Sequence, residues 1–152
     1  MDIDVVTEIV IDRPREEVAS FASDPDNATT WYRNIKRVEW RSSPQLLEVG
    51  SRIAFVAEFL GRTIAYTYEV RTMLPGERFV MGTSEGPFAM ETTYSWSDAP
   101  GGGTKMELRN RGTPSGFGKI AAPMMKAAMQ RANNKDLARL KQVLERESSF
   151  DR

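Results

Sequence analysis

The stretch Asp24–Trp40, which reads DPDNATTWYRNIKRVEW, predicts a short helix that leads directly into a strand. Asp24 is a suitable N-cap and Pro25 favours a first helical turn, so a short helix or turn starts here. Apolar and charged side chains then alternate, which predicts a strand at about residues 35–43. Trp31 lies between the two elements, and the stretch holds two of the chain's three tryptophans. We interpret it as a signature of the fold rather than as a catalytic cluster.

A strand and a first short helix precede this stretch. Residues 3–11 alternate between apolar and polar side chains, which predicts a strand with one buried face. Pro14 ends the strand and suits the first turn of a helix. The acidic side chains of Glu16 and Glu17 would stabilise the positive N-terminal end of that helix. We therefore predict a short helix over residues 14–22.

Period-two segments follow along most of the remaining chain. Short breaks rich in Gly and Pro separate them, and connections of this length make hairpins. The sequence therefore predicts an antiparallel sheet whose strands follow one another in a meander. The further strands are expected at about residues 51–60, 62–73, 77–84, 87–97 and 104–111.

After Thr113 the period changes to that of a helix, predicted over about residues 115–147. Pro123 lies inside this span, so the helix either begins near it or is kinked there. Residues 148–152 are expected to fray. One stripe of the helix is apolar apart from a single amide, and it contains Ala122, Met125, Met129, Asn133, Leu137, Leu140 and Leu144.

The composition excludes several kinds of site. The chain has no Cys and no His, which removes disulfides, thiolate chemistry, Ser-His-Asp triads and Cys/His metal sites. No metal and no cofactor are expected, and any catalysis must rest on carboxylates, Tyr, Lys, Arg, Ser or Thr. Lys plus Arg equals Asp plus Glu at 21 each, so we expect no nucleic acid as a partner. Residues 113–152 are nevertheless basic, with eight bases and four acids.

The length of 152 residues suits one domain over residues 1–152, large enough to bury a core with a cavity inside it. No apolar run approaches the length that spans a bilayer, so membrane insertion is not expected. Acidic residues occupy the place of a signal peptide's positive region, so the expected location is cytoplasmic. A monomer is the default expectation for the oligomeric state.

The strands separate into a charged face and an apolar face. The mid-strand glutamates are the obvious carboxylates for acid–base chemistry. Their parity instead places them on the outer face, beside basic residues with which they can pair across strands. These outward glutamates are Glu58, Glu69, Glu91 and Glu107.

The apolar face also carries hydroxyl groups. Tyr66, Tyr68, Thr92 and Tyr94 share its parity, and a buried hydroxyl needs a hydrogen-bond partner. Either each one sits at the rim of the sheet in contact with water, or together they provide polar anchor points inside a cavity. As a group they favour the cavity.

The long helix and Trp31 complete the predicted cavity. Met125 and Met129 either fill plain core or form an adaptable cavity wall. Asn133 must be satisfied if buried, by a nearby backbone carbonyl or by a ligand. Trp31 either lines or gates the cavity mouth, or anchors the short helices to the sheet. The candidate ligand-binding residues are Trp31, Phe55, Tyr66, Tyr68, Met90, Thr92, Tyr94, Met125, Met129 and Asn133.

Five short motifs mark the chain: residues 11–18 (IDRPREEV), 24–27 (DPDN) with a following Trp, 74–79 (LPGERF), 102–104 (GGT) and 136–141 (DLARLK). In this order they resemble the START-like, helix-grip superfamily, and more narrowly its polyketide cyclase/dehydrase branch of small bacterial proteins. The resemblance implies an α+β fold in which a curved antiparallel sheet of about seven strands wraps around the C-terminal helix, with a cavity between them.

The resemblance implies no single catalytic signature. Some members of the superfamily place His or an Arg/Asp pair in the cavity, whereas this chain has no His. The leading interpretation is binding or transport of a small hydrophobic ligand, either a lipid or an aromatic polyketide-like molecule. An alternative is a cyclase or dehydratase that holds such a ligand in a reactive shape, with Tyr68 or Tyr94 as a weak acid and Thr92 as an orienting group. A third interpretation is a protein-interaction module that uses the outer face.

Overall fold

The computed structural model describes residues 3–85, 89–113 and 121–150. The first half of the chain forms β1 (Ile3–Ile11), α1 (Arg15–Ser23), the 3-10 helix η1 (Pro25–Asn27), α2 (Ala28–Trp31), β2 (Ile35–Trp40) and β3 (Arg52–Phe59). The second half forms β4 (Arg62–Leu74), β5 (Arg78–Glu85), β6 (Ala89–Asp98), the 3-10 helix η2 (Pro100–Gly102), β7 (Thr104–Thr113) and α3 (Ala122–Phe150). This is the predicted order of strand, short helices, meander and long helix.

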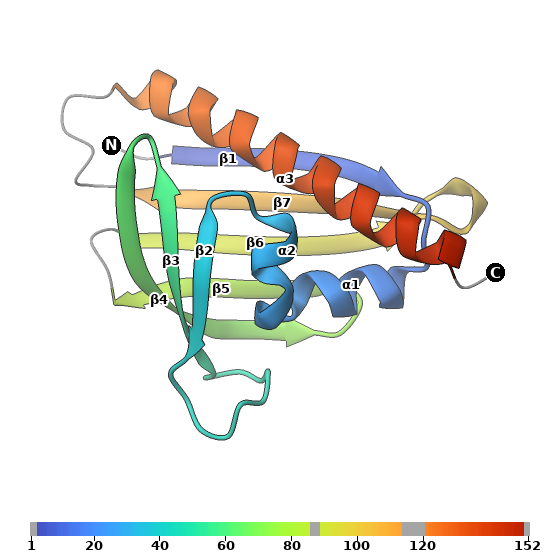
Figure 1. Cartoon of the computed structure of the whole chain (residues 1–152), viewed down its shortest axis with the longest axis horizontal. Coiled ribbons are helices and arrows are strands. Elements are labelled where there is room, and N and C mark those ends of the chain that lie inside the picture. Colours follow the sequence, from blue (N-terminus) through green and yellow to red (C-terminus); the bar gives the residue numbers. More distant parts are fainter. Residues whose placement is uncertain (1–2, 86–88, 114–120, 151–152) are drawn as a thin grey trace.

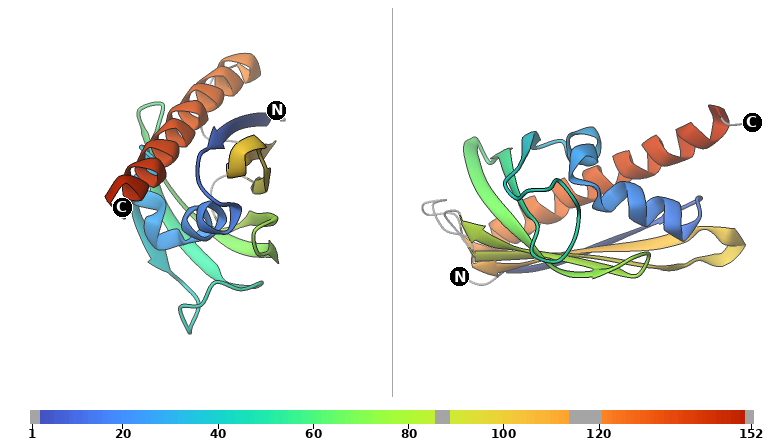
Figure 2. Two further views of the ribbon diagram at one scale, coloured as in Figure 1. Left: turned by 90° about the vertical axis from the view of Figure 1, so that its right-hand side faces the viewer. Right: turned by 90° about the horizontal axis from the view of Figure 1, so that it is seen from below.

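The seven strands form one antiparallel sheet in the order β1-β7-β6-β5-β4-β3-β2 (Figure 1). Consecutive strands pair from β2 to β7, as a meander requires, and β1 pairs with β7 in a register that sets Ile3 opposite Gly112. The helices α1, α2 and α3 all lie on one face of the sheet, and the β3–β4 hairpin curls up toward α3 (Figure 2). The curved sheet and α3 therefore enclose a common interior.

The stretch from Asp24 to Trp40 has the predicted local structure. The Asp24 side chain accepts a hydrogen bond from the Asp26 backbone N–H at 3.0 Å, and Pro25 occupies the first turn of η1. The indole Nε1 of Trp40 donates to Asp26 Oδ1 at 3.0 Å and so links β2 back to η1. β2 ends at Trp40, earlier than the predicted residue 43, although the Arg41 backbone N–H still donates to the Arg52 carbonyl of β3 at 2.8 Å.

The C-terminal helix begins at Ala122, so Pro123 falls in its first turn and does not kink it. Residues 115–120, which were predicted to be helical, lie outside the described residues. The helix continues to Phe150, past the predicted end near residue 147. The predicted fraying of residues 148–152 stays a prediction, and residues 151–152 lie outside the described residues. None of the described helices is long and apolar enough to span a membrane.

The core lies between the inner face of the sheet and the helices. Its largest fully buried side chains include Trp31, Phe79, Met106, Leu137 and Leu140. The outer face is charged, as the strand parity predicts. On that face Glu91 forms ion pairs with Arg71 and Arg111, with N–O distances of 3.6 and 3.0 Å.

At position 112 in the sheet, the backbone leaves no room for any side chain, so only glycine fits. Gly112 in β7 has a φ angle of +154°, and a β-carbon built there would overlap the carbonyl oxygen of Ala89 and crowd Met90 on β6. The two strands therefore approach closely at this point because no side chain separates them.

Candidate ligand-binding cavity

A cavity of about 160 Å³ lies between α3, the short helices and the inner face of the sheet. Strands β3, β4, β5 and β6 supply most of its wall, and α3 covers it with Met125, Met129, Ala132, Asn133 and Asp136. The α2–β2 turn contributes Tyr32 and Asn34. An engineered cavity of similar size, lined by apolar side chains, admits benzene, so the enclosed space suits about one ring or a short chain.

The structure brings most of the predicted site residues together. The residues that line the cavity are Phe55, Tyr66, Tyr68, Met90, Thr92, Tyr94, Met125, Met129 and Asn133. Their common location follows from strand parity and from the apolar stripe of α3. Contact of these residues with a ligand stays a prediction.

Trp31 does not line the cavity, which corrects the expectation that it lines or gates the mouth. Its side chain is fully buried behind Tyr32 and Tyr94, with ring centroids 4.0 and 5.8 Å away. Its indole Nε1 has no hydrogen-bond partner among the described residues. Trp31 therefore acts as the core anchor of the short helices, and Tyr32 takes the place on the cavity wall.

The wall formed by β3 and β4 is aromatic. Phe55 and Tyr66 stack with ring centroids 5.6 Å apart, and Tyr68 lies 5.0 Å from Tyr66 and 5.8 Å from Phe55. Offset and tilted arrangements at these distances are favourable and leave ring faces and edges toward the interior. The wall can therefore receive a flat apolar group.

Two hydroxyl networks cross the cavity wall. Thr92 Oγ1 donates to Asn110 Oδ1 at 2.8 Å, so the Tyr68 hydroxyl, 3.0 Å away, is the donor to Thr92. The hydroxyls of Tyr32 and Tyr94 hydrogen bond to each other at 2.5 Å. Asn110 and Tyr32 were not among the predicted site residues, although Asn110 lies directly opposite Thr92 in the β6–β7 register.

Burial controls the protonation of the tyrosines. Desolvation raises the pKa of Tyr68 to about 12, and the same cause raises the pKa values of Tyr32, Tyr66 and Tyr94 well above the ordinary value. All four side chains are neutral at physiological pH. They are weaker acids than free tyrosine, which counts against the weak-acid role considered for Tyr68 or Tyr94.

The most polar end of the cavity lies on α3. Asn133 is buried, and its Nδ2 has no hydrogen-bond partner among the described residues, so the expected bond to a backbone carbonyl is not formed. One turn later, Asp136 is only 3% exposed, and its Oδ1 accepts the backbone N–H of Arg33 at 3.0 Å. The cavity thus offers an unused donor beside a buried carboxyl group.

Asp136 is the carboxyl group that α3 contributes to the cavity wall, and the half-buried Asp24 lines the cavity from the side of the short helices. Desolvation raises its pKa to about 6, and the hydrogen bond from the Arg33 N–H opposes that rise. A carboxyl group with a pKa near physiological pH can both accept and donate a proton. Sequence reasoning missed this residue, although its position one turn from Asn133 and from Leu140 was a usable signal.

The described residues contain no group of three or more carboxylates that could hold a metal ion. Among residues 3–85, 89–113 and 121–150, the cavity lining therefore offers neutral hydroxyls, the amides of Asn34, Asn110 and Asn133, and the carboxyl groups of Asp24 and Asp136 around an aromatic space.

The curved antiparallel sheet, the covering C-terminal helix and the cavity between them define the helix-grip, START-like class of proteins. Within that class, the chain belongs to the family described as polyketide cyclase/dehydrase and lipid transport, whose sequence model matches residues 2–145. A search of curated proteins gave no significant match.

Solved structures share the fold at low sequence identity. A START superfamily protein from Mycobacterium smegmatis has a TM-score of 0.80 at 16% identity, covering 94% of this chain and 97% of that one. The Zhui aromatase/cyclase from a Streptomyces species also has a TM-score of 0.80 at 16% identity, with 97% and 96% covered. A protein from Thermus thermophilus has a TM-score of 0.76 at 22% identity, with 91% and 94% covered.

Proposed function

We propose that the protein binds a small hydrophobic molecule in the cavity and that this molecule carries a hydrogen-bond acceptor directed at Asn133. The observation that carries the proposal is the buried, unpartnered Nδ2 of Asn133 on the wall of an otherwise aromatic space. A buried donor without a partner is costly, and a ligand carbonyl, ether or hydroxyl oxygen would remove that cost. The family description, which names lipid transport and polyketide enzymes, agrees with an apolar ligand.

Acetophenone and ethylbenzene test the role of the amide, because they differ only in a carbonyl group and a methylene group. We expect the wild-type protein to prefer acetophenone in isothermal titration calorimetry by about 5- to 150-fold, the equivalent of roughly 1–3 kcal/mol for an unmade buried hydrogen bond. Asn133→Leu should reverse or abolish this preference. Equal affinities in the wild type would refute the role of Asn133.

A cavity-filling variant tests the location of the ligand. Ala132 lines the cavity, and Ala132→Leu adds three carbon atoms where we expect the ligand, so affinity should fall by at least about tenfold. Ala138→Leu is the matched control, since Ala138 lies on the same helix and is exposed. An equal loss of affinity in both variants would show that the ligand binds elsewhere.

Asp136 favours a second candidate function, acid–base chemistry on the bound ligand. With the ligand carbonyl hydrogen bonded to Asn133, the Asp136 carboxylate would remove a proton from the adjacent carbon, and the amide would stabilise the enolate that forms. Deuterium exchange at the methyl group of acetophenone in heavy water, followed by NMR, measures this step. Asp136→Asn should abolish protein-dependent exchange while acetophenone still binds; unchanged exchange would remove Asp136 from the reaction.

A further inference from the structure

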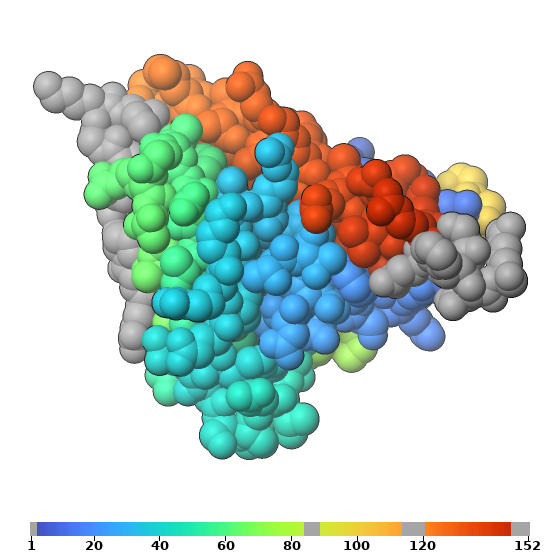
Figure 3. All heavy atoms as spheres, viewed as in Figure 1, coloured from blue at the N-terminus to red at the C-terminus, as the bar shows by residue number. Residues whose placement is uncertain are grey.

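The cavity opens between α3 and the strands that curl toward it. Eight of its lining residues are half-buried, and four of these lie where α3 faces β3 and the α2–β2 turn: Asn34 on the turn, Phe59 at the end of β3, and Met129 and Ala132 on α3. Figure 3 shows α3 beside β2 and the β3–β4 hairpin on this face of the molecule. These four residues define the cavity mouth, through which a ligand longer than one ring would project.

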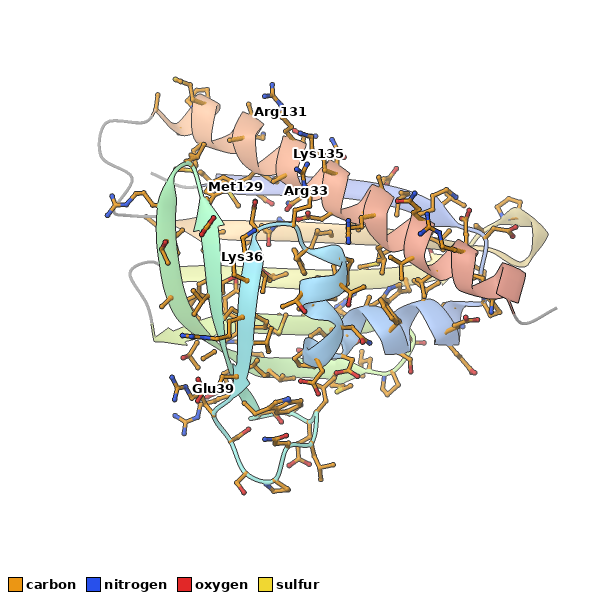
Figure 4. The ribbon with its side chains drawn as sticks, viewed as in Figure 1. Arg33, Lys36, Glu39, Met129, Arg131 and Lys135 are labelled. Atoms are coloured by element: carbon orange, nitrogen blue, oxygen red, sulfur yellow. The ribbon has the colours of Figure 1, made fainter. Side chains whose placement is uncertain are left out.

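Cationic side chains flank the mouth on both sides. Arg33 and Lys36 directly flank the lining residues 34–35, and Arg131 and Lys135 surround the lining residues 132–133. All four cations are exposed, and we call them the mouth cations. Figure 4 shows Arg131 and Lys135 on α3, with Arg33 and Lys36 on the facing turn and strand.

Hydrogen bonds hold the two sides together. The backbone N–H of Arg33 donates to Asp136 Oδ1 at 3.0 Å, which fixes Arg33 against α3 next to Lys135. The Nζ of Lys36 donates to the backbone carbonyl of Arg33 at 3.1 Å. The positive charges of the turn and of the helix are therefore kept close to one another.

The mouth cations form no close ion pair among the described residues, although the charge of Arg33 also acts on the buried Asp136 and lowers its pKa. None of the four forms an ion pair with a carboxylate within 4.0 Å, whereas cations of the outer face such as Lys105 and Arg109 do. From Ala122 to Leu144, the only carboxyl group of α3 is that of Asp136, which is buried. Next to the mouth residues, exposed Glu58 precedes Phe59, and its backbone N–H donates to the Asn34 carbonyl at 2.8 Å. The four mouth cations outnumber this acid, so the net exposed charge there is positive.

We propose that the ligand is an anionic amphiphile, with an apolar part in the cavity and a carboxylate or phosphate group at the mouth cations. This inference rests on the proposed function and adds the charged group that sequence and fold alone do not indicate. Exposed cations without a close ion pair on two facing elements provide the donors and the positive potential that an anion requires. The short enclosed space leaves the anionic end of a chain at the mouth.

Hexanol, hexanoate and hexyl phosphate test this inference, because they share one chain and differ in the terminal group. We expect calorimetry to give tighter binding of both anions than of hexanol at low salt. Each exposed ion pair contributes up to about fivefold in affinity, so two pairs should give about 5- to 25-fold. The preference should shrink as salt is added, while hexanol binding stays constant.

A matched pair of variants locates the effect. Arg33→Gln with Lys135→Gln removes two mouth cations and keeps the Arg33 backbone N–H, and we expect it to lose the preference for anions while binding hexanol as before. Arg52→Gln with Arg78→Gln changes the net charge equally at two exposed positions that do not line the cavity, and should keep the preference. The relative affinity of hexanoate and phosphate ester then tells which anion the mouth favours.

Three results overturn the inference. If hexanol and the two anions bind equally to the wild type, or if both double variants lose the preference equally, the proposed function stands and the mouth cations do not recognise the ligand. If none of the three binds and acetophenone also fails to bind, the proposed function itself is wrong and this inference falls with it.

Discussion

The substitution Asp136→Asn should stabilise the protein at neutral and alkaline pH. The folded state keeps this carboxyl group buried, and desolvation raises its pKa from 3.8 to about 6. A shift of about two units corresponds to about 3 kcal/mol, which the wild-type protein loses when the carboxyl group ionises inside the folded state. The Asn side chain has no charge to desolvate, and its carbonyl oxygen can still accept the Arg33 N–H.

The sign of the effect sets its pH dependence. Because the folded pKa lies above the unfolded value, Asp136 contributes stability that is complete below about pH 4 and is lost as the pH rises through about 6. The Asp136→Asn variant does not lose this stability, because its side chain does not ionise. The difference in unfolding free energy between variant and wild type should therefore grow by about 3 kcal/mol from about pH 4 to about pH 8 and stay constant above that.

Urea unfolding followed by tryptophan fluorescence across this pH range measures the difference. Other carboxyl groups titrate in both proteins and cancel in the comparison. Asp4→Asn is a control of opposite sign: the hydrogen bond from Arg109 lowers the pKa of Asp4, so the wild type gains stability above the unfolded pKa, and the control variant should be the less stable protein at about pH 8. A constant difference for Asp136→Asn across the whole range would refute the reasoning, because it would mean that Asp136 does not titrate differently in the folded state.

Two further predictions concern the sheet and the tyrosines. Gly112→Ala should lower the unfolding free energy by more than about 2 kcal/mol, because the new β-carbon would overlap the Ala89 carbonyl oxygen. Gly50→Ala has open space at its β-carbon and should lower it by only about 1 kcal/mol, through backbone strain. Equal urea midpoints for the two variants would contradict this. Since all four tyrosines have raised pKa values, the folded protein should show no tyrosinate absorbance until about pH 11, while the urea-unfolded chain should ionise near pH 10. Ionisation of any tyrosine near pH 10 in the folded protein would be inconsistent with its burial.

The sheet and the cavity wall could be predicted because one face of each strand is buried. Burial on one side imposes a period of two, so Phe55, Tyr68 and Tyr94 could be assigned to the interior without knowing the pairing. The stripe on α3 placed Met125 and Asn133 beside them for the same reason at a period of 3.6.

The polar end of the cavity was harder to predict. Asp136 is buried because Arg33, 103 positions away in the chain, supplies a backbone N–H to its carboxyl group. Helical spacing places Asp136 beside the apolar stripe, but the contact with Arg33 cannot be read from that spacing, and a charged residue next to an apolar stripe normally faces solvent. The sequence also predicted Trp31 on the cavity wall, where Tyr32 lies instead. The helix α2 has only four residues, so packing of Trp31 against Tyr94 rather than helical periodicity decides which side chain faces the cavity.

The pairing of β1 with β7 also determines when the chain can fold during synthesis. Thr7 and Leu108, which face one another across these strands, are 101 positions apart. At about 5–20 residues per second, β1 waits roughly 5–20 seconds on the ribosome before its partner strand is made. Throughout that time Ile3, Val5 and Ile11, which are buried in the finished sheet, lack the strand that covers them. The nascent chain therefore presents the apolar face of β1 before the strand that covers it has been made.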